Sequence, residues 1–319
     1  MRRSISVVVP VYNSEGTLDD LHRRLREVLD GLDADYELLL VNDGSADASW
    51  DRIAELAAGD ERVRGMNLMR NYGQHNALLA GIRSARHEIV VTLDDDLQNP
   101  PEEIPKLLAK LDEGFDVVYG SAQERGFGVL RNAGTAMTKL ALRWVIGSDI
   151  AGKVSAFRAF RTELRDAFED FDAPYVSIDV LLSWGTTKFG SVQVVHQERA
   201  EGKSSYSFTR LATHALNVMT GFSTRPLRIA SLIGLVFTLF GIAVLVIVIV
   251  TYVVEGGSVP GFPFLASVIA IFAGAQLLTL GIIGEYLARM HMRVMDRPPF
   301  TIREEVGADV REEIGAAGS

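Results

Sequence analysis

Three aspartates and a glutamine, Asp94, Asp95, Asp96 and Gln98, stand directly after the apolar run Ile89 to Leu93. Adjacent carboxylates repel one another, and burying several of them without compensation is costly, so a cation would stabilise the group. Along an extended chain, alternation places Asp94, Asp96 and Gln98 on one side and Asp95 on the other. Carboxylate and amide oxygens are hard ligands that suit Mg²⁺ or Mn²⁺. The pattern therefore predicts a metal site made by Asp94, Asp96 and Gln98.

A second interpretation of the same acids is structural. They precede Asn99-Pro-Pro101, and acidic residues before a proline at the first helical positions are common helix caps. On spacing alone, aspartates that cap a helix beginning near Pro101 and solubilise a turn stay an alternative to the metal site. The rest of the chain has to decide between the two.

The composition excludes several classes of protein. The chain has 319 residues, which favours two domains, and its net charge of −9 offers no basic surplus for binding nucleic acid. It contains no cysteine, so disulfides and thiolate metal sites are excluded. The first residues carry positive charge but only a short apolar run before Pro10, which indicates a first strand rather than a signal peptide.

Apolar runs alternate with amphipathic helical patterns over the first part of the chain. Strands are expected at Ser4–Pro10, Tyr36–Val41, Val63–Met69, Ile89–Leu93 and Phe115–Ser121. Helices are expected over Glu15–Leu32, through Trp50, Ile53 and Leu56, from about Gln74 to Arg86, and over Pro101–Glu113. Strands separated by helices of this length predict a doubly wound α/β domain with a mostly parallel sheet.

Polar residues follow three of these strands. Pro10–Asn13, Asn42–Gly44 and Asp94–Gln98 should meet at one edge of the sheet, where open α/β sheets bind ligands. A dinucleotide oxidoreductase is disfavoured because the first turn lacks GxGxxG, and no P-loop GxxxxGK[ST] is present. We therefore expect a nucleotide-binding crevice at this edge of the sheet that uses neither motif.

Two long apolar segments lie near the C-terminus. Ile229–Val254 contains no charge and Phe262–Gly284 follows after a short loop, and about 20 apolar residues suffice to span a bilayer. Arginines flank the pair on the outside, whereas the loop between them has no Lys or Arg. The positive-inside rule then predicts a multi-pass protein of the cytoplasmic membrane, with the catalytic domain and both termini in the cytoplasm.

These patterns divide the chain into four parts. We expect a cytoplasmic catalytic domain over 1–207, a juxtamembrane amphipathic helix over 208–228, two transmembrane helices within 229–288 (229–254 and 262–288), and a cytoplasmic tail over 289–319. The tail from Arg303 is acidic and rich in Gly and Ala, which predicts a disordered end. Gly126–Gly147 fits an interfacial helix with a cationic face, and an ordinary core helix equally well.

The ordered motifs carry a resemblance. Val7-Val-Val-Pro-Val-Tyr-Asn13, Val41-Asn-Asp-Gly-Ser45, Arg70-Asn-Tyr-Gly-Gln-His75 and Thr92-Leu-Asp-Asp-Asp-Leu-Gln-Asn-Pro-Pro101 resemble the motif series of glycosyltransferase family 2. Within that family, the two apolar segments and the preceding Ser223-Thr-Arg-Pro-Leu227 make the chain similar to the polyprenyl-phosphate glycosyltransferases. The resemblance implies a GT-A fold followed by a transmembrane hairpin, a nucleotide-sugar donor of UDP or GDP type, and a polyprenyl phosphate acceptor.

The resemblance also implies roles for individual residues. Asp94, Asp96 and Arg131 are expected at the catalytic centre, and Asp94, Asp96 and Gln98 as ligands of Mg²⁺ or Mn²⁺. Nucleotide contacts are expected from Pro10, Val11, Tyr12, Asn13, Glu15, Asp43, Gly44, Asp94 and Asp95. The acceptor phosphate and the diphosphate are assigned to Arg125, Arg131, Arg199, Lys203, Ser205, Tyr206 and Arg210. Relatives form assemblies through the membrane region, which leaves a homo-oligomer open.

The expected reaction is metal-dependent transfer of a sugar to a lipid phosphate with inversion at the anomeric carbon. A phosphate monoester is already largely dianionic near pH 7, so a strong general base is less necessary than for a hydroxyl acceptor. Two other functions stay open: a processive polysaccharide synthase, although its QxxRW motif is absent at Arg143-Trp144, and a non-catalytic membrane scaffold on the same fold.

Overall fold

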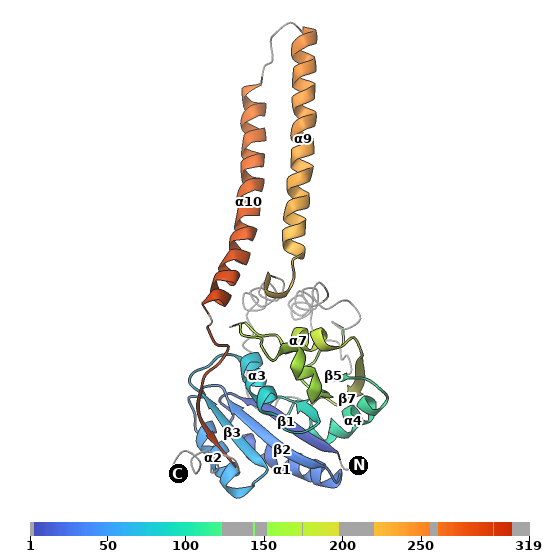
Figure 1. Cartoon of the computed structure of the whole chain (residues 1–319), viewed down its shortest axis with the longest axis vertical. Helices are drawn as coiled ribbons and strands as arrows, with labels where there is room; N and C mark the ends of the chain where they lie inside the picture. The colour runs from blue at the N-terminus through green and yellow to red at the C-terminus, as the bar shows by residue number, and fades with distance from the viewer. Residues whose placement is uncertain are drawn as a thin grey trace.

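An α/β domain carries two long helices that project from one of its ends (Figure 1). The computed structural model describes residues 3–122, 143, 152–173, 175–197, 220–255, 261–295 and 297–307. Its strands are β1 (Ser4–Val11), β2 (Asp35–Asn42), β3 (Val63–Leu68), β4 (Ile89–Thr92), β5 (Val117–Ala122), β6 (Arg158–Arg161), β7 (Phe189–Val194) and β8 (Ile302–Val306). They form one sheet in the order β7-β5-β6-β4-β1-β2-β3-β8.

Helices cover both faces of this sheet. They are α1 (Leu18–Gly31), α2 (Ser49–Gly59), α3 (Gln74–Ser84), η1 (Pro101–Glu103), α4 (Ile104–Asp112), η2 (Thr162–Phe168) and α7 (Ile178–Gly185). The sheet residues alternate between two cores: Val7 and Val9 of β1 pack with α1 and α4, whereas Val8 packs with α3 and α7. Since both faces are covered, β1 and β2 are almost continuously apolar, as expected for buried parallel strands.

The sheet is mixed rather than wholly parallel. β1 pairs in parallel with β2 and β4, β2 with β3, and β5 with β7. β6 is antiparallel to β4 and β5, and β8 is antiparallel to β3. The five strands expected from sequence are confirmed within one or two residues. β6, β7 and β8 were not expected, because these short strands lack a long apolar run; β7 and β8 are the two edges of the sheet, and β6 lies between β5 and β4.

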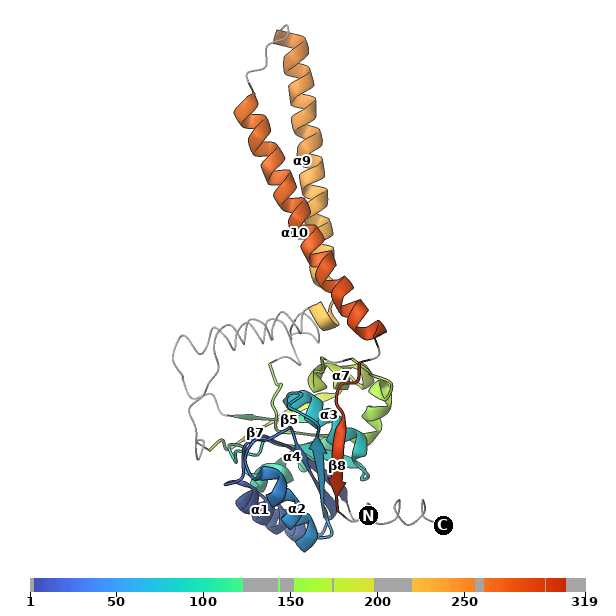
Figure 2. The same ribbon diagram turned by 90° about the vertical axis from the view of Figure 1, so that its left-hand side faces the viewer.

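The expectation that the tail is disordered from Arg303 is wrong for its first residues. Ile302–Val306 forms β8, with Ile302 opposite Leu68 and Val306 opposite Gly65 (Figure 2). The side chain of Val306 packs against the core that α1 and α2 cover. Glu304 and Glu305 lie on this edge strand, which pairs with β3 on one side only. Charged side chains are common on such strands because they discourage pairing with another chain on the open side. The sheet of the α/β domain therefore includes residues that follow the two long helices.

The long helices are α9 (Arg225–Glu255) and α10 (Phe262–Val294). Within them, Arg225–Thr251 and Ile271–Val294 are long and apolar enough to cross a membrane, and neither segment is buried in the protein. Thr238 and Thr279 bond their hydroxyls to the backbone one turn earlier, which satisfies these polar groups within the helix. The two helices run side by side in both views (Figures 1 and 2).

The base of the helices contacts the domain through an aromatic cluster. Phe222, just before α9, stacks on Phe171 at 6.2 Å between ring centroids, and Trp184 of α7 meets both rings edge-on. Tyr175 lies 6.2 Å from Phe222 in the same cluster, and its pKa is raised to about 12 by burial. These contacts hold the start of α9 over the end of the domain where α7 lies.

Candidate active site

The three aspartates lie in the turn that follows β4. The strand ends at Thr92, and Leu97 has a φ of 59°, so the segment is a tight turn and not the extended chain that the alternation argument assumed. Asp95 has partners of its own on the β1 side of the turn. It accepts hydrogen bonds from the backbone N–H of Tyr12 at 3.1 Å and from the hydroxyl of Ser14 at 2.5 Å. Asp95 thus ties the end of β1 to the end of β4.

Asp94 is the most perturbed carboxylate of the turn. Burial raises its pKa to about 6, with further contributions from the charges of Asp96 and Asp95. The charge of Arg158 and a 2.5 Å hydrogen bond from the side-chain amide of Gln74 act in the opposite direction. A half-buried carboxylate beside two others carries more negative charge than its surroundings balance, which is the electrostatic setting of a cation site.

The donor set fits a divalent cation with few protein ligands. Among the described residues, no three or more His, Asp or Glu side chains converge on a point. Asp94 and Asp96 with the Gln98 amide would supply two carboxylates and a neutral oxygen, and Mg²⁺ is typically held by one or two carboxylates together with substrate phosphates. These residues would therefore hold a cation whose remaining ligands come from a bound diphosphate.

Asp43, at the end of β2, lies at the same edge of the sheet. It is only 3% exposed, and its two carboxylate oxygens accept the backbone N–H groups of Tyr72 at 2.7 Å and Gly73 at 2.9 Å. Burial raises the pKa of Asp43, and the two hydrogen bonds oppose that rise. Asp43 therefore fixes the loop before α3, and each oxygen retains a lone pair for a ligand donor.

The expected nucleotide-binding residues at the end of β1 differ in solvent exposure. Val11 is fully buried, and its carbonyl already accepts the Asp43 N–H at 2.9 Å. Tyr12 is 52% exposed, beside the turn that Asp95 fixes. Asn13 has a φ of 53° and receives the N–H of Ala46 on its side-chain oxygen at 2.8 Å. Tyr12 and Asn13 are thus the exposed residues of this segment, and the nucleotide contacts expected of them stay predictions.

Gly44 has a structural reason to be glycine. Its φ is +65°, and a Cβ there would lie 2.5 Å from the backbone carbonyl carbon of Arg70 and from the backbone nitrogen of Asn71. Only glycine allows this close approach. The turn after β2 and the loop before α3 are therefore packed backbone to backbone, next to the hydrogen bonds of Asp43.

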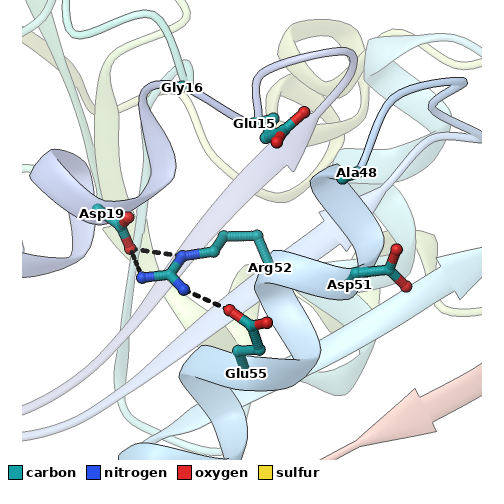
Figure 3. A pocket seen from close by; sticks show the side chains of 7 residues that line it. All are labelled: Glu15, Gly16, Asp19, Ala48, Asp51, Arg52 and Glu55. Carbon is teal, nitrogen blue, oxygen red and sulfur yellow. Dashed lines mark hydrogen bonds and ion pairs between the residues drawn. The ribbon is translucent and has the colours of Figure 1, made fainter.

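Glu15 lies at a separate hollow. Its side chain lines a depression of about 600 Å³ between α1 and α2, together with Gly16, Asp19, Ala48, Asp51, Arg52 and Glu55 (Figure 3). Within the hollow, Arg52 binds Asp19 and Glu55, so its charge is already balanced. The nucleotide contact expected of Glu15 stays a prediction.

The acceptor-site expectations fall outside the described residues. These are Arg125, Arg131, Arg199, Lys203, Ser205, Tyr206 and Arg210, together with most of the amphipathic segments 126–147 and 208–228. Pro10, Val11, Tyr12, Asn13, Asp43, Gly44, Asp94, Asp95, Asp96 and Gln98 are brought together at the carboxyl edge of β1, β2 and β4.

A buried ion pair beneath this edge was missed. Arg158 of β6 is 1% exposed, and its guanidinium binds the Asp179 carboxylate at 2.5 Å. The Tyr119 hydroxyl donates to the same carboxylate oxygen at 3.0 Å. Burial, followed by the charge of Asp179, raises the pKa of Tyr119 well above its usual range. The signal in the sequence was one arginine inside the apolar run Ala156-Phe-Arg-Ala-Phe160, although nothing there names its partner.

Comparison with known proteins decides the family. The sequence model of the family described as glycosyl transferase family 2 matches residues 6–167, just over half of the chain. The chain belongs to glycosyl transferase family 2. The matched residues include every strand end that bears the candidate site, from Pro10 to Gln98.

Solved structures show which fold this family 2 glycosyltransferase has. Glucosyl-3-phosphoglycerate synthase from Mycobacterium tuberculosis, in complex with Mn²⁺, UDP and glucosyl-3-phosphoglycerate, is 20% identical, with a TM-score of 0.52 over 68% of this chain and 78% of that chain. The complex of the same enzyme with Mn²⁺ and UDP-glucose is 21% identical, with a TM-score of 0.52 over 68% and 77%. The fold is GT-A, as the sequence motifs led us to expect, and two apolar C-terminal helices are added to it.

Proposed function

We propose that this glycosyltransferase transfers a sugar from a nucleotide-sugar to a polyprenyl phosphate at a membrane surface. The observation that carries the proposal is the direction in which the candidate site faces. β8 follows α10 closely in the chain and begins with Ile302 opposite Leu68, the last residue of β3. The carboxyl ends of the parallel strands, which bear Asp43 and Asp94, therefore face the end of the domain from which α9 and α10 leave (Figure 2).

A lipid acceptor fits this arrangement. If α9 and α10 span a bilayer, a phosphate at the membrane surface lies on the side of the domain that carries the candidate site. Arg225, Arg228, Arg289, Arg293 and Arg297 flank the two helices at their domain end, which supports a cytoplasmic location for the domain and both termini. The same arginines would attract anionic headgroups.

The donor is proposed to be a nucleotide-sugar bound with a divalent cation. The structurally similar synthase was solved with Mn²⁺ and UDP-glucose, which supports UDP as the first nucleotide to test. Asp94, Asp96 and Gln98 would hold the cation. When bound, the cation would stabilise the negative charge of the departing diphosphate.

The chain's own residues would orient the reactants. Asp95 holds the Tyr12 turn and Asp43 holds the loop before α3, so both walls of the nucleotide crevice are fixed before a ligand arrives. In the transfer, a phosphate oxygen of the lipid forms the new bond to the anomeric carbon while the bond to the nucleoside diphosphate breaks. A single displacement of this kind inverts the anomeric configuration, and the dianionic acceptor needs no strong base. Asp179 is engaged by Arg158 and Tyr119, which argues against it as a free base.

The acceptor phosphate is proposed to bind the basic residues expected from sequence. Arg125 and Arg131 precede β6 in the chain, and Arg199, Lys203, Ser205, Tyr206 and Arg210 lie between β7 and α9. The first segment connects β5 to β6, and the second connects β7 to α9. Guanidinium and ammonium groups there would suit a phosphate on a lipid.

The test is transfer of radiolabelled sugar from UDP- and GDP-sugars to undecaprenyl phosphate, with the full chain in detergent. Reactions are run with Mn²⁺, with Mg²⁺ and with EDTA. Asp96→Ala is compared with Asp166→Ala, which changes an exposed aspartate on η2. We expect metal-dependent label in the lipid phase, lost in Asp96→Ala and kept in Asp166→Ala.

Other outcomes would support the other functions. Label in a water-soluble phosphorylated acceptor such as phosphoglyceric acid would overturn the lipid acceptor while keeping the transferase. Label in a long polymer would indicate a processive synthase. Absence of turnover with every donor and acceptor would favour a scaffold. Retention of the donor's anomeric configuration, measured by NMR coupling in the product, would exclude single displacement.

A further inference from the structure

A chain of side-chain hydrogen bonds runs from the candidate nucleotide site to the strand that follows the two long helices. At the site end, the backbone N–H of Asn13 donates to the Ser45 hydroxyl at 3.0 Å, and the Ser45 hydroxyl donates to the Asn42 side-chain oxygen at 2.5 Å. The Asn42 amide donates to the Asn67 side-chain oxygen at 2.8 Å, and the Asn67 amide donates to Glu304 Oε1 at 2.9 Å.

Every donor in this chain points the same way. The backbone N–H of Ser45, which can only donate, also reaches the Asn42 side-chain oxygen at 3.3 Å, and the last acceptor is a carboxylate, which when ionised can only accept. These two groups determine the orientation of the two amides between them. Hydrogen bonds aligned head to tail polarise one another, and a charged terminal acceptor strengthens the series.

Burial makes the chain selective for this arrangement. Asn42 is 2% exposed and Asn67 6% exposed, so the two amides have little access to water as a replacement partner, whereas Glu304 at the end of the series is exposed. Asn67 and Glu304 are direct register partners across the β3–β8 pair, which places the carboxylate beside the amide. Removal of the carboxylate would leave a buried donor of Asn67 unpaired and would free the amide to reverse.

The site end of the chain holds a residue in the left-handed conformation. Asn13 has a φ of 53°, which asparagine adopts more readily than most other non-glycine residues. It is held by its N–H on Ser45 and by the Ala46 N–H on its own side chain. With its hydrogen directed at Asn42, the Ser45 hydroxyl presents its lone pairs to the Asn13 N–H. The turn that presents Tyr12 therefore depends on the orientation of Asn42.

We propose that Glu304 is a positioning residue for nucleotide binding, which acts through Asn67, Asn42 and Ser45 on the Asn13 turn. This inference rests on the proposed function, since it concerns the same nucleotide site. It gives β8, the strand after α10, a role in donor recognition. β8 is an edge strand of the sheet, and β3 and β2 lie between it and β1. A residue of the C-terminal segment thus contributes to binding without contacting the ligand.

The test uses the full chain in detergent and three variants. Glu304→Ala removes the terminal acceptor, and Glu304→Gln keeps an oxygen acceptor at the same place without the charge. Glu305→Ala changes the next residue of β8, which is exposed and opposite Met66. UDP and GDP affinity are measured by calorimetry, and exchange of the Asn13 and Ser45 amides with deuterium is measured without ligand.

We expect Glu304→Ala to weaken nucleotide binding at least fivefold, to raise the donor KM with kcat within twofold of wild type, and to accelerate exchange at Asn13. Glu304→Gln should restore most of the affinity, and Glu305→Ala should match wild type. A merely structural role of Glu304 would lower the melting temperature without this split between KM and kcat.

Two results separate the inference from the proposed function. If wild type binds UDP or GDP and Glu304→Ala changes neither affinity nor exchange, the positioning role is overturned and the transferase stands. If wild type binds neither nucleotide, the proposed donor and the role of Glu304 in its recognition both fail. Faster exchange at Asn13 in Glu304→Ala would then show only that the series of hydrogen bonds exists.

Discussion

The carboxylate of Asp95 holds the backbone N–H of Tyr12 at 3.1 Å across 83 residues of sequence. The same oxygen accepts the Ser14 hydroxyl, so the turn after β1 is bound to the turn after β4. The middle acid of the three is thus engaged in joining two strand ends, while Asp94 and Asp96 are the acids expected at the metal.

Replacement of Asp95 separates these two roles. Asp95→Ala removes a charged acceptor, and hydrogen bonds to charged groups contribute about 1.5–3 kcal/mol, so UDP affinity should fall about ten- to a hundredfold. Asp95→Asn keeps one oxygen acceptor and should lose less. Calorimetry with UDP checks this, and unchanged affinity in Asp95→Ala would contradict it.

Removal of the Asp94 charge should change how stability depends on pH. The pKa of Asp94 is raised from 3.8 to about 6 by burial, so its folded form prefers the proton. Its contribution to stability is fully present below pH 3.8 and is lost as pH rises through about 6. In EDTA, Asp94→Asn should therefore be more stable than wild type at pH 7.5, by at most about 3 kcal/mol, with no such gain at pH 4.

Melting of both proteins from pH 4 to pH 8 provides the measurement. The difference between the two melting temperatures should grow up to about pH 6 to 7 and then level off, and titrations shared by both proteins cancel in it. A constant difference across the range would contradict the burial of Asp94. Added Mn²⁺ should stabilise wild type more than Asp94→Asn, since the cation would bind the ionised carboxylate.

Single replacement of Asp179 should destabilise the domain. Asp179→Ala leaves Arg158 buried without its partner and the Tyr119 hydroxyl without its acceptor, which should cost about 3–5 kcal/mol. The double variant Arg158→Met and Asp179→Leu removes both charges and should recover much of the loss. Chemical unfolding in detergent measures both, and equal losses in the single and double variants would contradict a paired interaction.

Gly44→Ala tests the close backbone contact. A Cβ at this position would require both a strained φ and displacement of Arg70 and Asn71, for a cost of about 1–3 kcal/mol or more. Gly16→Ala is the matched control, because a Cβ there has nothing within 4 Å. The melting temperature should fall in Gly44→Ala and stay near wild type in Gly16→Ala. Similar values for the two would show that the turn adapts freely.

The parallel half of the sheet and the site edge could be predicted because their signals are local. Long apolar runs such as Val7–Val11 and Leu38–Val41 predict buried strands, and the polar residues directly after them identify the edge. β6 and β8 have short, charged sequences, Arg158–Arg161 and Ile302–Val306, whose strand character comes from pairing with β4 and β3. Pairing with a distant strand leaves no mark in local periodicity.

The partners of individual site residues were equally hard to foresee. Alternation suggested that Asp95 differs from Asp94 and Asp96, and the structure agrees, but the cause is the turn with Leu97 at positive φ. Gln74 as a donor to Asp94 and Asp179 as the partner of Arg158 arise from contacts between separate elements. Such contacts depend on how α3 and α7 pack on the sheet, which no spacing in the sequence specifies.

The placement of β8 also sets an order of events during synthesis. Glu304 is made 237 residues after Asn67, with α9 and α10 between them. At about 5–20 residues per second, β3 stays an open strand edge for roughly 12 to 50 seconds while the ribosome completes those helices. Open edges are templates for aggregation. The nascent domain thus completes its sheet only after α9 and α10 have been made, so any delay before β8 pairs with β3 would prolong the interval in which the domain is most prone to misfold.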